Sequence, residues 1–307
     1  MQEPSISVVI PTFNPGAELR ALLEGLATQA RPASETLLID SSPDPEAARR
    51  LAREFEARFE RVGSEGFGHG RTRNRAAALC SGGLIAFFTQ DALPADEDVL
   101  GKLSEAALIE NVAGAYARQL PREDATAKTR AEVLGWFEGG SAPMIQEQLR
   151  LGEWHRLSPM DRYRRARFDN VASMVRAEAL RAHPFPETWF GEDISWGKRV
   201  IESGQALAYA PAARVIHSHD RSAGYEFKRT VNCHARLHEL FGLETLPHLS
   251  GALWGFVRES LGGIAGAASL EEAAKLPPRE AARAFGQYFG ARLSRLGLAG
   301  RIHFRGI

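Results

Sequence analysis

Asp91 is the residue whose position in the sequence points most directly to chemistry. It stands just past Leu84 to Phe88, a run of apolar residues preceded by two glycines. Such a short run favours a strand covered on both faces of a parallel sheet. Open α/β sheets bind their ligands beyond the carboxyl ends of such strands, where a carboxylate can hold Mg2+ or Mn2+ against a diphosphate. The alternative is that Asp91 only caps the following helix.

Polar side chains also follow the other predicted strands of the N-terminal half. Pro11, Thr12 and Asn14 come after the first strand, Asp40 comes after the second, and Gln90 directly precedes the acid described above. Because the carboxyl ends of parallel strands share one edge, we expect these loops to meet there. Asp40 can accept a hydrogen bond from the ring N–H of a uracil or thymine. The same residue types are also common in ordinary turns.

A glycine-rich turn, Gly66 to Gly70, follows the third predicted strand. Its G-x-G-x-G spacing is not the G-x-G-x-x-G of a dinucleotide-binding turn, and the G-K-[ST] of a phosphate-binding P-loop is absent. The turn opens onto a helix whose first residues include Arg73 and Asn74. Backbone N–H groups and an arginine there suit the diphosphate or base of a nucleotide. The alternative is a flexible loop with a solvated arginine.

Two adjacent acids, Glu192 and Asp193, open a helix after an aromatic-rich loop. Adjacent side chains point in different directions, so one acid is expected to reach a cleft while the other holds the loop. An ionised carboxylate in that cleft could take a proton from an acceptor hydroxyl. The favourable interaction of acids with a helix N-terminus would also explain the pair.

Two histidines, His217 and His219, stand at the end of a short predicted strand. The alternation of side chains along a strand places both on one face. One imidazole could complete a metal site that Asp91 begins. The alternative is a pair of partly exposed histidines at a strand end.

The first 120 residues alternate predicted strands and helices, which indicates βαβ units and an α/β fold with a mostly parallel central sheet flanked by helices. The expected strands cover residues 6–10, 36–39, 61–62, 84–88, 112–116, 169–175, 206–209 and 214–217, and the expected helices cover 15–28, 45–55, 71–80 and 193–203.

We expect residues 1–222 to form one catalytic domain. Within it, residues 120–168 have no clear strand and form an insertion that shapes the acceptor side. Residues 223–307 form a helical extension, with breaks predicted at Gly242, Gly262-Gly263 and Pro277-Pro278.

The chain from Arg279 onward has six arginines and one glutamate. Such an end could contact a phosphorylated or membrane-surface partner, and a solvated helix face is the default alternative.

The composition is that of a soluble globular protein of 307 residues. Lysine plus arginine equals aspartate plus glutamate at 38 each, so no global charge favours a nucleic-acid partner. Two cysteines exclude a disulfide scaffold and fit a reducing, cytoplasmic compartment. The longest apolar segment, residues 253–268, is interrupted by Arg258 and Glu259, so no membrane span is expected.

Taken in order, five segments resemble glycosyltransferase family 2: residues 6–14, 38–42, 67–74, 88–94 and 191–193. The resemblance covers roughly residues 5–220 and rests on the order of the motifs. It implies a GT-A fold and an inverting enzyme. The Asp-Ser-Ser, His-Gly-x-Thr-Arg-Asn and Thr-Gln-Asp-Ala forms are most similar to the bacterial rhamnosyltransferase branch, whose donor is dTDP-L-rhamnose.

The resemblance also implies roles for individual residues. Asp91 matches the last position of the family's D-x-D motif, which meets the metal, while Thr89 replaces the first acid. Asp193 matches the catalytic base, with Glu192 as its acidic neighbour. His217 matches the metal-contacting histidine best, and His219 is close enough to compete. The expected donor-binding residues, with Thr12 and Asp40 at the base and Arg73 at the nucleotide, are Pro11, Thr12, Asn14, Asp40, Arg73, Asn74, Gln90 and Asp91.

The sequence therefore predicts a metal-dependent inverting glycosyltransferase that moves L-rhamnose from dTDP-L-rhamnose onto a saccharide or lipid-linked saccharide in surface polysaccharide synthesis. Two alternatives stay open. One is a catalytically silent nucleotide-sugar or glycan-binding protein. The other is a nucleotidyltransferase, which would normally have a glycine- and arginine-rich loop after the first strand, unlike residues 11–14. A homodimer and a peripheral contact with the inner face of the cell membrane are further expectations.

Overall fold

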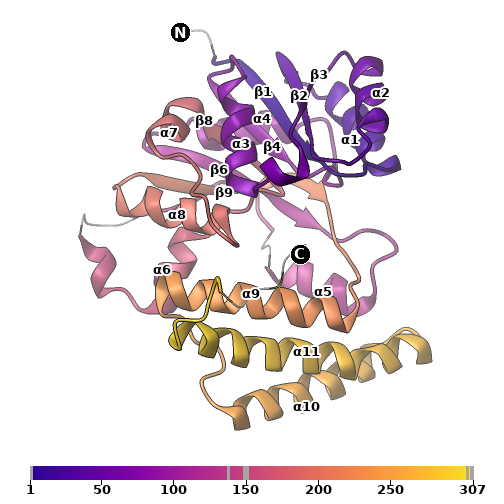
Figure 1. Ribbon diagram of the computed structural model, residues 1–307, viewed down its shortest axis with the longest axis vertical. Helices are drawn as coiled ribbons and strands as arrows, with labels where there is room; N and C mark the ends of the chain where they lie inside the picture. Colours follow the sequence, from indigo (N-terminus) through magenta and orange to yellow (C-terminus); the bar gives the residue numbers. More distant parts are fainter. Residues whose placement is uncertain (1–2, 137–138, 148–151, 302–303, 305–307) are drawn as a thin grey trace.

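The computed structural model describes residues 3–136, 139–147, 152–301 and 304, which form a nine-stranded mixed sheet, helices on both of its faces and a layer of long C-terminal helices (Figure 1). The strands are β1 (Ile6–Thr12), β2 (Glu35–Asp40), β3 (Arg58–Arg61), β4 (Leu84–Phe88), β5 (Leu93–Pro94), β6 (Val112–Leu120), β7 (Met144–Gln146), β8 (Ala172–Arg176) and β9 (Ala206–Ile216). The helices are α1 (Ala17–Ala27), α2 (Glu46–Glu54), α3 (His69–Ala78), α4 (Val99–Ala107), α5 (Ala127–Trp136), α6 (Pro159–Ala166), α7 (Ala177–Ala182), α8 (Glu192–Glu202), α9 (Ala223–Phe241), α10 (Leu249–Gly266) and α11 (Leu270–Arg295).

The order of the strands brings the functional loops to one edge of the sheet. The order is β3-β2-β1-β4-β8-β6-β9-β5, and β7 also pairs with β9. Strands β1 to β4 are parallel to one another, and β6 is parallel to β9. Strand β8 lies between β4 and β6 and runs antiparallel to both. The loops after β1, β2, β4, β6 and β9 therefore meet the loop before β8 at a single edge. The predicted fold class is confirmed.

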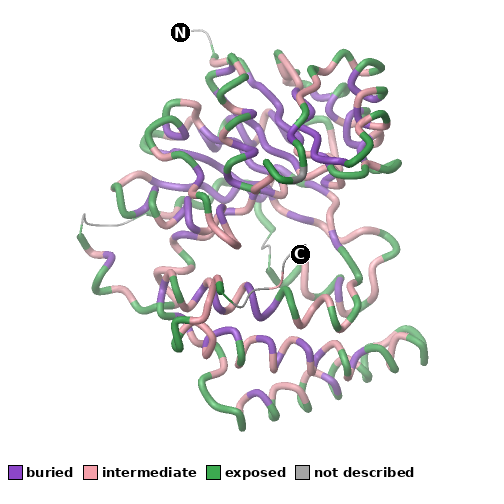
Figure 2. Tube along the Cα trace, viewed as in Figure 1, coloured by how far each residue is buried: buried purple, intermediate pink, exposed green. Residues whose placement is uncertain are grey.

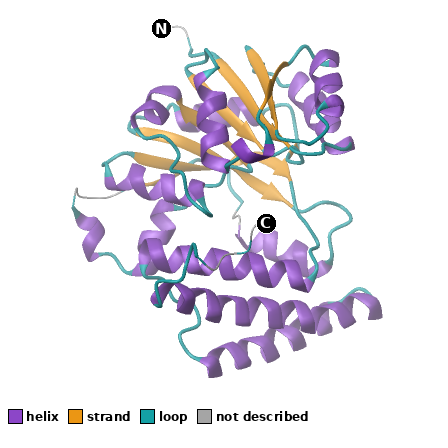
Figure 3. Cartoon of the chain, in the orientation of Figure 1, coloured by secondary structure: helices purple, strands orange, loops and turns teal. Residues whose placement is uncertain are grey.

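Two hydrophobic cores, one on each face of the sheet, hold these strands in place (Figures 2 and 3). One face packs against α1, α2 and α4, and the other against α3, α7 and α8, with Trp196 fully buried there. All five residues of β4 are buried, as an apolar run covered on both faces requires.

Several predicted boundaries differ from the structure. The first strand continues through Pro11, because β4 pairs with β1 only up to Val9 and the missing proline N–H lies beyond that ladder. The two strands expected at 206–209 and 214–217 are one strand, β9, with an irregularity in its pairing to β6. The segment expected to lack strands contains β7, and α7 was not predicted.

The C-terminal helices differ more from the sequence prediction. Helix α9 ends at Gly242, as expected. However, α10 continues through Gly262-Gly263, and α11 continues through Pro277-Pro278. Both predicted breaks are wrong, because packing outweighs the local preference of glycine and proline. A side chain at Gly290 would come within 2.5 Å of the Val231 carbonyl, so glycine lets α11 lie directly against α9.

Helix α9 also belongs to the core beneath the sheet. Its residue Phe241 is buried and its ring lies near the rings of Trp154 and Tyr163, at centroid distances of 6.2 and 6.1 Å. The boundary expected at residue 222 therefore falls between segments that share a hydrophobic core.

Three arginines near the end of the chain make ion pairs within the protein. Arg279 and Arg283 both pair with Glu132 on α5, and Arg295 pairs with Glu244. These pairs reduce the free positive charge that the sequence suggested for a phosphorylated or membrane-surface partner. Among the residues that the structure describes, no helix combines the length and the apolar character needed to span a membrane.

Candidate active site

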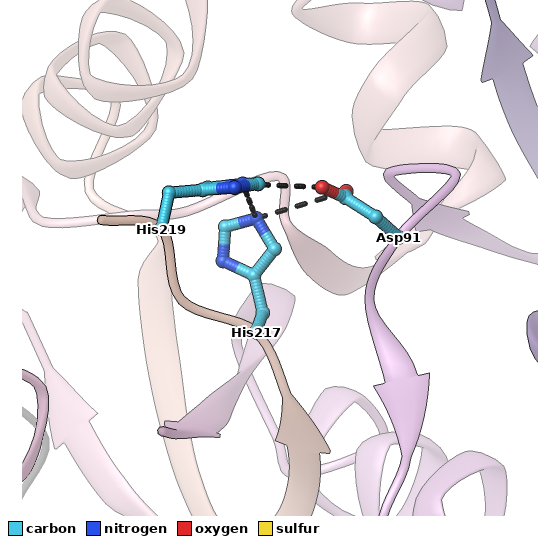
Figure 4. Close-up of side chains that lie close together, drawn as sticks. All are labelled: Asp91, His217 and His219. Carbon is cyan, nitrogen blue, oxygen red and sulfur yellow. Dashed lines mark hydrogen bonds and ion pairs between the residues drawn. The ribbon is translucent and has the colours of Figure 1, made fainter. Parts of the chain in front are cut away.

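The acid after β4 and the two histidines after β9 meet because of the short strand β5. After Asp91 the chain turns back, and Leu93 pairs antiparallel with Ile216 at the end of β9. This pairing sets Asp91 beside the two residues that follow β9, His217 and His219 (Figure 4).

The three side chains form a cluster with the geometry of a metal site. The Nε2 atom of His219 lies 3.1 Å from Oδ2 of Asp91, and the Nε2 atom of His217 lies 3.7 Å from Oδ1. The two Nε2 atoms are 3.2 Å apart. One ligand atom from each residue lies within 4.8 Å of the others, so all three can reach one ion. Both histidines, and not only one of them, therefore lie beside Asp91.

The protonation states of the cluster also suit a cation. Burial alone would raise the pKa of Asp91, but the hydrogen bond from His219 and the charges of the two histidines hold that pKa well below its usual value. Burial lowers the pKa of His217 to about 4, against the attraction of Asp91. At neutral pH the Asp91 carboxylate is therefore ionised and the His217 imidazole is neutral, as metal ligands must be.

A cavity of about 510 Å³ opens beside this cluster. It has the size of a small-molecule binding site. Four residues singled out from the sequence line it, namely Asn14, Gln90, Asp91 and His219. The cavity also has lining residues that sequence reasoning missed, including Arg122, Ser218 and Asp220.

Hydrogen bonds join the loops after β1 and β2. Asp40 is fully buried, and its carboxylate accepts hydrogen bonds from the hydroxyls of Thr12 and Ser42, both at 2.8 Å. The Ser42 hydroxyl in turn accepts the N–H of Asn14 at 2.7 Å. Asp40 thus links the two loops through these hydrogen bonds. Neither Asp40 nor Thr12 is among the described residues that line the cavity.

The loops after β1 and β4 are joined by an amide side chain. Gln90 accepts the Phe13 N–H at 2.9 Å and donates to the Phe13 carbonyl at 3.1 Å. Together with the Asp40 contacts, this confirms that the loops after the first, second and fourth strands meet at one edge.

Arg73 and Asn74 on α3 make contacts that position other elements. Arg73 is buried and donates to Glu192 at 2.6 Å, and Asn74 uses both ends of its amide on the backbone of Phe185. The donor contacts expected of Arg73 and Asn74 stay predictions. In this structure the two residues tie α3 to the loop that leads into α8.

Asp193, the second acid of the pair, makes no such ion pair with the residues that the structure describes. Gly191 precedes the pair with a φ of 65°, a left-handed conformation that favours glycine, and α8 then begins at Glu192. Burial raises the pKa of Asp193 to about 8, helped by the charges of Glu192 and Asp169. A carboxylate with a pKa near the working pH is suited to accept a proton. Glu192 holds α3 through Arg73, and the role of Asp193 in the cleft stays a prediction.

The mixed α/β sheet, with an acid–histidine cluster at the edge where the loops after β1, β2, β4 and β9 meet, has the architecture of the GT-A type. Residues 7–172, more than half of the chain, match the model of the Glycosyl transferase family 2. The chain belongs to this family. The nucleotidyltransferase alternative is thereby set aside.

Two relatives are O-antigen chain rhamnosyltransferases. WbaN of Salmonella anatum is 28% identical over 234 residues, which cover 74% of this chain and 70% of WbaN. RfbN of Salmonella typhimurium strain LT2 is 28% identical over 231 residues, which cover 73% of this chain and 69% of RfbN.

Solved structures show the same fold. The mannosyltransferase PcManGT from Pyrobaculum calidifontis, in complex with GDP-Man and Mn2+, has a TM-score of 0.62 at 19% identity, covering 96% of this chain and 88% of that one. Glucosyl-3-phosphoglycerate synthase from Mycobacterium tuberculosis has a TM-score of 0.50 at 18% identity, covering 78% and 81%.

Proposed function

We propose that this glycosyltransferase moves L-rhamnose from dTDP-L-rhamnose onto a hydroxyl of a saccharide or lipid-linked saccharide, with inversion at the anomeric carbon. The observation that supports the proposal is the Asp91–His217–His219 cluster and its indirect link to Asp193. Gln119 contacts both His217 and Asp169, and the charge of Asp169 acts on Asp193. The similarity to two O-antigen chain rhamnosyltransferases supports the choice of donor. The family motifs found in the sequence support an inverting reaction.

Asp193 is the proposed catalytic base. Its carboxylate takes the proton of the acceptor hydroxyl as the hydroxyl oxygen bonds to the anomeric carbon. The bond from that carbon to the diphosphate oxygen breaks, and dTDP leaves with the electron pair. Attack from the face opposite the nucleotide inverts the configuration. Glu192 supports this step by holding Arg73, which leaves Asp193 as the acid of the pair able to face the acceptor.

Asp91, His217 and His219 are the proposed ligands of a divalent cation. One carboxylate and two imidazoles fit Mn2+ better than Mg2+, because Mg2+ strongly prefers oxygen ligands. When bound, the ion supplies Lewis-acid stabilisation of the charge on the departing diphosphate. The adjacent cavity is lined by Asn14, Gln90 and Arg122, which are the proposed donor contacts.

The deeper donor-binding candidates are proposed to act mainly by shaping that cavity. Pro11 lies in β1 and is not among the described residues that line the cavity, while Thr12 and Asp40 join the ends of β1 and β2 through their hydrogen bond. The proposed catalytic domain is residues 1–222, with 120–168 on the acceptor side and 223–307 as the helical extension. A homodimer stays a prediction.

A donor screen tests this proposal. Purified protein is incubated with Mn2+ and each of dTDP-L-rhamnose, UDP-glucose and GDP-mannose, and the release of nucleoside diphosphate is measured. We expect slow hydrolysis of dTDP-L-rhamnose above the other two. Hydrolysis of another donor would replace the proposed sugar. Tight binding of dTDP-L-rhamnose with no hydrolysis and no transfer to any saccharide would support the silent binding protein instead.

The metal ligands are tested by calorimetry. Loss of a residue that only hydrogen-bonds to a metal ligand typically lowers metal affinity by about 10–100-fold. Asp91→Ala removes a ligand itself, so it should weaken dTDP binding in the presence of Mn2+ by more than that. Binding without metal should change little. Equal nucleotide affinity of the variant and the wild type with Mn2+ present would contradict the assignment.

A further inference from the structure

Gln119, near the end of β6, contacts the back of the proposed metal ligand His217. The Nδ1 atom of His217 lies 2.8 Å from Oε1 of Gln119, on the side of the ring away from Asp91. Gln119 is 8% exposed, so water does not readily replace this contact. An amide oxygen only accepts hydrogen bonds. The imidazole must therefore carry its proton on Nδ1, which leaves the lone pair of Nε2 directed at the cluster.

Asp169 determines which way round the Gln119 amide lies. The amide nitrogen of Gln119 donates to Oδ2 of Asp169 at 2.6 Å, and Oδ1 of Asp169 accepts the Val171 N–H at 2.8 Å. Burial raises the pKa of Asp169, while the Val171 N–H and the charges of Arg229, Arg167 and Arg73 act against that rise and favour the ionised form. In that form the carboxylate only accepts hydrogen bonds, so the NH2 end of the amide faces it. A flipped amide would set its oxygen against the carboxylate oxygen of Asp169.

We propose that Gln119 is a positioning residue which, oriented by Asp169, fixes the tautomer and ring direction of His217 for the divalent cation. The inference rests on the proposed metal site and deepens it. Partners on the far nitrogen of a ligating histidine commonly perform this task, and their loss typically costs about 10–100-fold in metal affinity. Here the partner of His217 is the Gln119 amide, and the Asp169 carboxylate contacts that amide and not the histidine.

The same carboxylate links the metal cluster to the base. Asp169 is one of the charges that raise the pKa of Asp193. It stands in the loop that enters β8, the antiparallel strand between β4 and β6. That reversed strand places Asp169 at the edge where the other functional loops end. Asp169 therefore acts on both halves of the site through one side chain.

The test compares Gln119→Leu with the double variant Gln119→Glu/Asp169→Asn. The leucine removes the acceptor from Nδ1. The double variant keeps the total charge, keeps an acceptor for His217 and keeps a hydrogen bond between positions 119 and 169, with its direction reversed. Mn2+ affinity is measured by electron paramagnetic resonance, and the His217 tautomer is measured by 15N NMR of the metal-free protein.

We expect Gln119→Leu to bind Mn2+ about 10–100-fold more weakly and to lose the single Nδ1–H tautomer. The double variant should restore both properties to near their wild-type values. Gln29→Leu is the matched control, because Gln29 is also buried and hydrogen-bonded but contacts Gly25, Asp96 and Leu100 instead. It should lower stability and leave Mn2+ affinity unchanged.

Two results would overturn the inference. One is an unchanged tautomer and unchanged Mn2+ affinity in folded Gln119→Leu. The other is a double variant as weak as the single variant. Failure of the wild type to bind Mn2+ would instead count against the metal site itself. Failure to use dTDP-L-rhamnose would affect only the proposed donor, since neither readout involves the sugar.

Discussion

The sheet edge and the outer face of α10 are opposite kinds of surface. At the edge, the polar side chains of Asp40, Gln90 and Gln119 are held by specific hydrogen bonds. Helix α10 lies outermost in the C-terminal layer (Figure 1) and buries little more than Ala252 and Ser260. Its outer face exposes large apolar side chains, with Trp254 at 66% and Leu261 at 64%.

The two surfaces differ in how strongly their side chains are fixed by contacts within the protein. Polar groups that are partly buried are costly unless they are paired, so the network at the edge has few alternative arrangements. The exposed apolar residues of α10 gain little from folding, because burial is what makes such side chains stabilising. We therefore expect substitutions at the edge to change catalysis strongly and substitutions on α10 to change little.

The largest expected effect is on catalysis, from Asp193→Asn. The amide cannot accept the acceptor proton, and loss of a general base typically lowers kcat by about 10²–10⁴-fold. The measurement is transfer of L-rhamnose with binding of dTDP followed by calorimetry. Nucleotide affinity should stay near that of the wild type. A variant that binds nucleotide and keeps full turnover would remove Asp193 from its proposed role.

The next effect is on stability and tests whether the helical extension is separate from the sheet. Phe241→Ala deletes a ring that packs with Trp154 and Tyr163 in the core. It should lower the free energy of unfolding by about 3–5 kcal/mol, as buried aromatic truncations do. Denaturant unfolding provides the measurement. A loss below about 1 kcal/mol would indicate that α9 is not part of that core.

Sequence reasoning located the acid–histidine cluster because its residues follow strands whose ends are visible as apolar runs. It did not find Gln119 or Arg122, since β6 was expected to end at residue 116 and in fact extends to Leu120. Recognising the longer strand would have placed both residues at the functional edge. No local signal identifies Asp169 as their partner, because that contact depends on the antiparallel insertion of β8.

The C-terminal helices were harder to predict for a different reason. Glycine and proline pairs signal breaks in an isolated helix. Here Gly263 packs against Leu276, and α11 continues past Pro277-Pro278 while it lies against α9. Long-range packing of this kind outweighs local preference and leaves no trace in the neighbouring sequence.

The pH dependence of turnover gives a smaller but specific effect. Burial, with the charges of Glu192 and Asp169, raises the pKa of Asp193 to about 8, against the opposing charge of Arg73. Below that pH the base is increasingly protonated, so kcat/KM should fall by about tenfold per pH unit. In Asp169→Asn one of the charges that raise this pKa is removed, and the acidic limb should move to lower pH. A limb that stays in place would show that Asp169 does not act on the base.

The smallest expected effect is on the outer face of α10. Trp254→Gln and Leu261→Gln replace side chains that are already mostly in water, so each should change the free energy of unfolding by no more than about 0.5 kcal/mol. Turnover with a soluble saccharide acceptor should match that of the wild type. Trp196→Gln is the matched control, because Trp196 is fully buried and donates its indole N–H to the His183 carbonyl at 2.6 Å. If the α10 variants lost as much free energy of unfolding as that control, the outer face of α10 would contribute to stability. The contrast with the sheet edge would then be wrong.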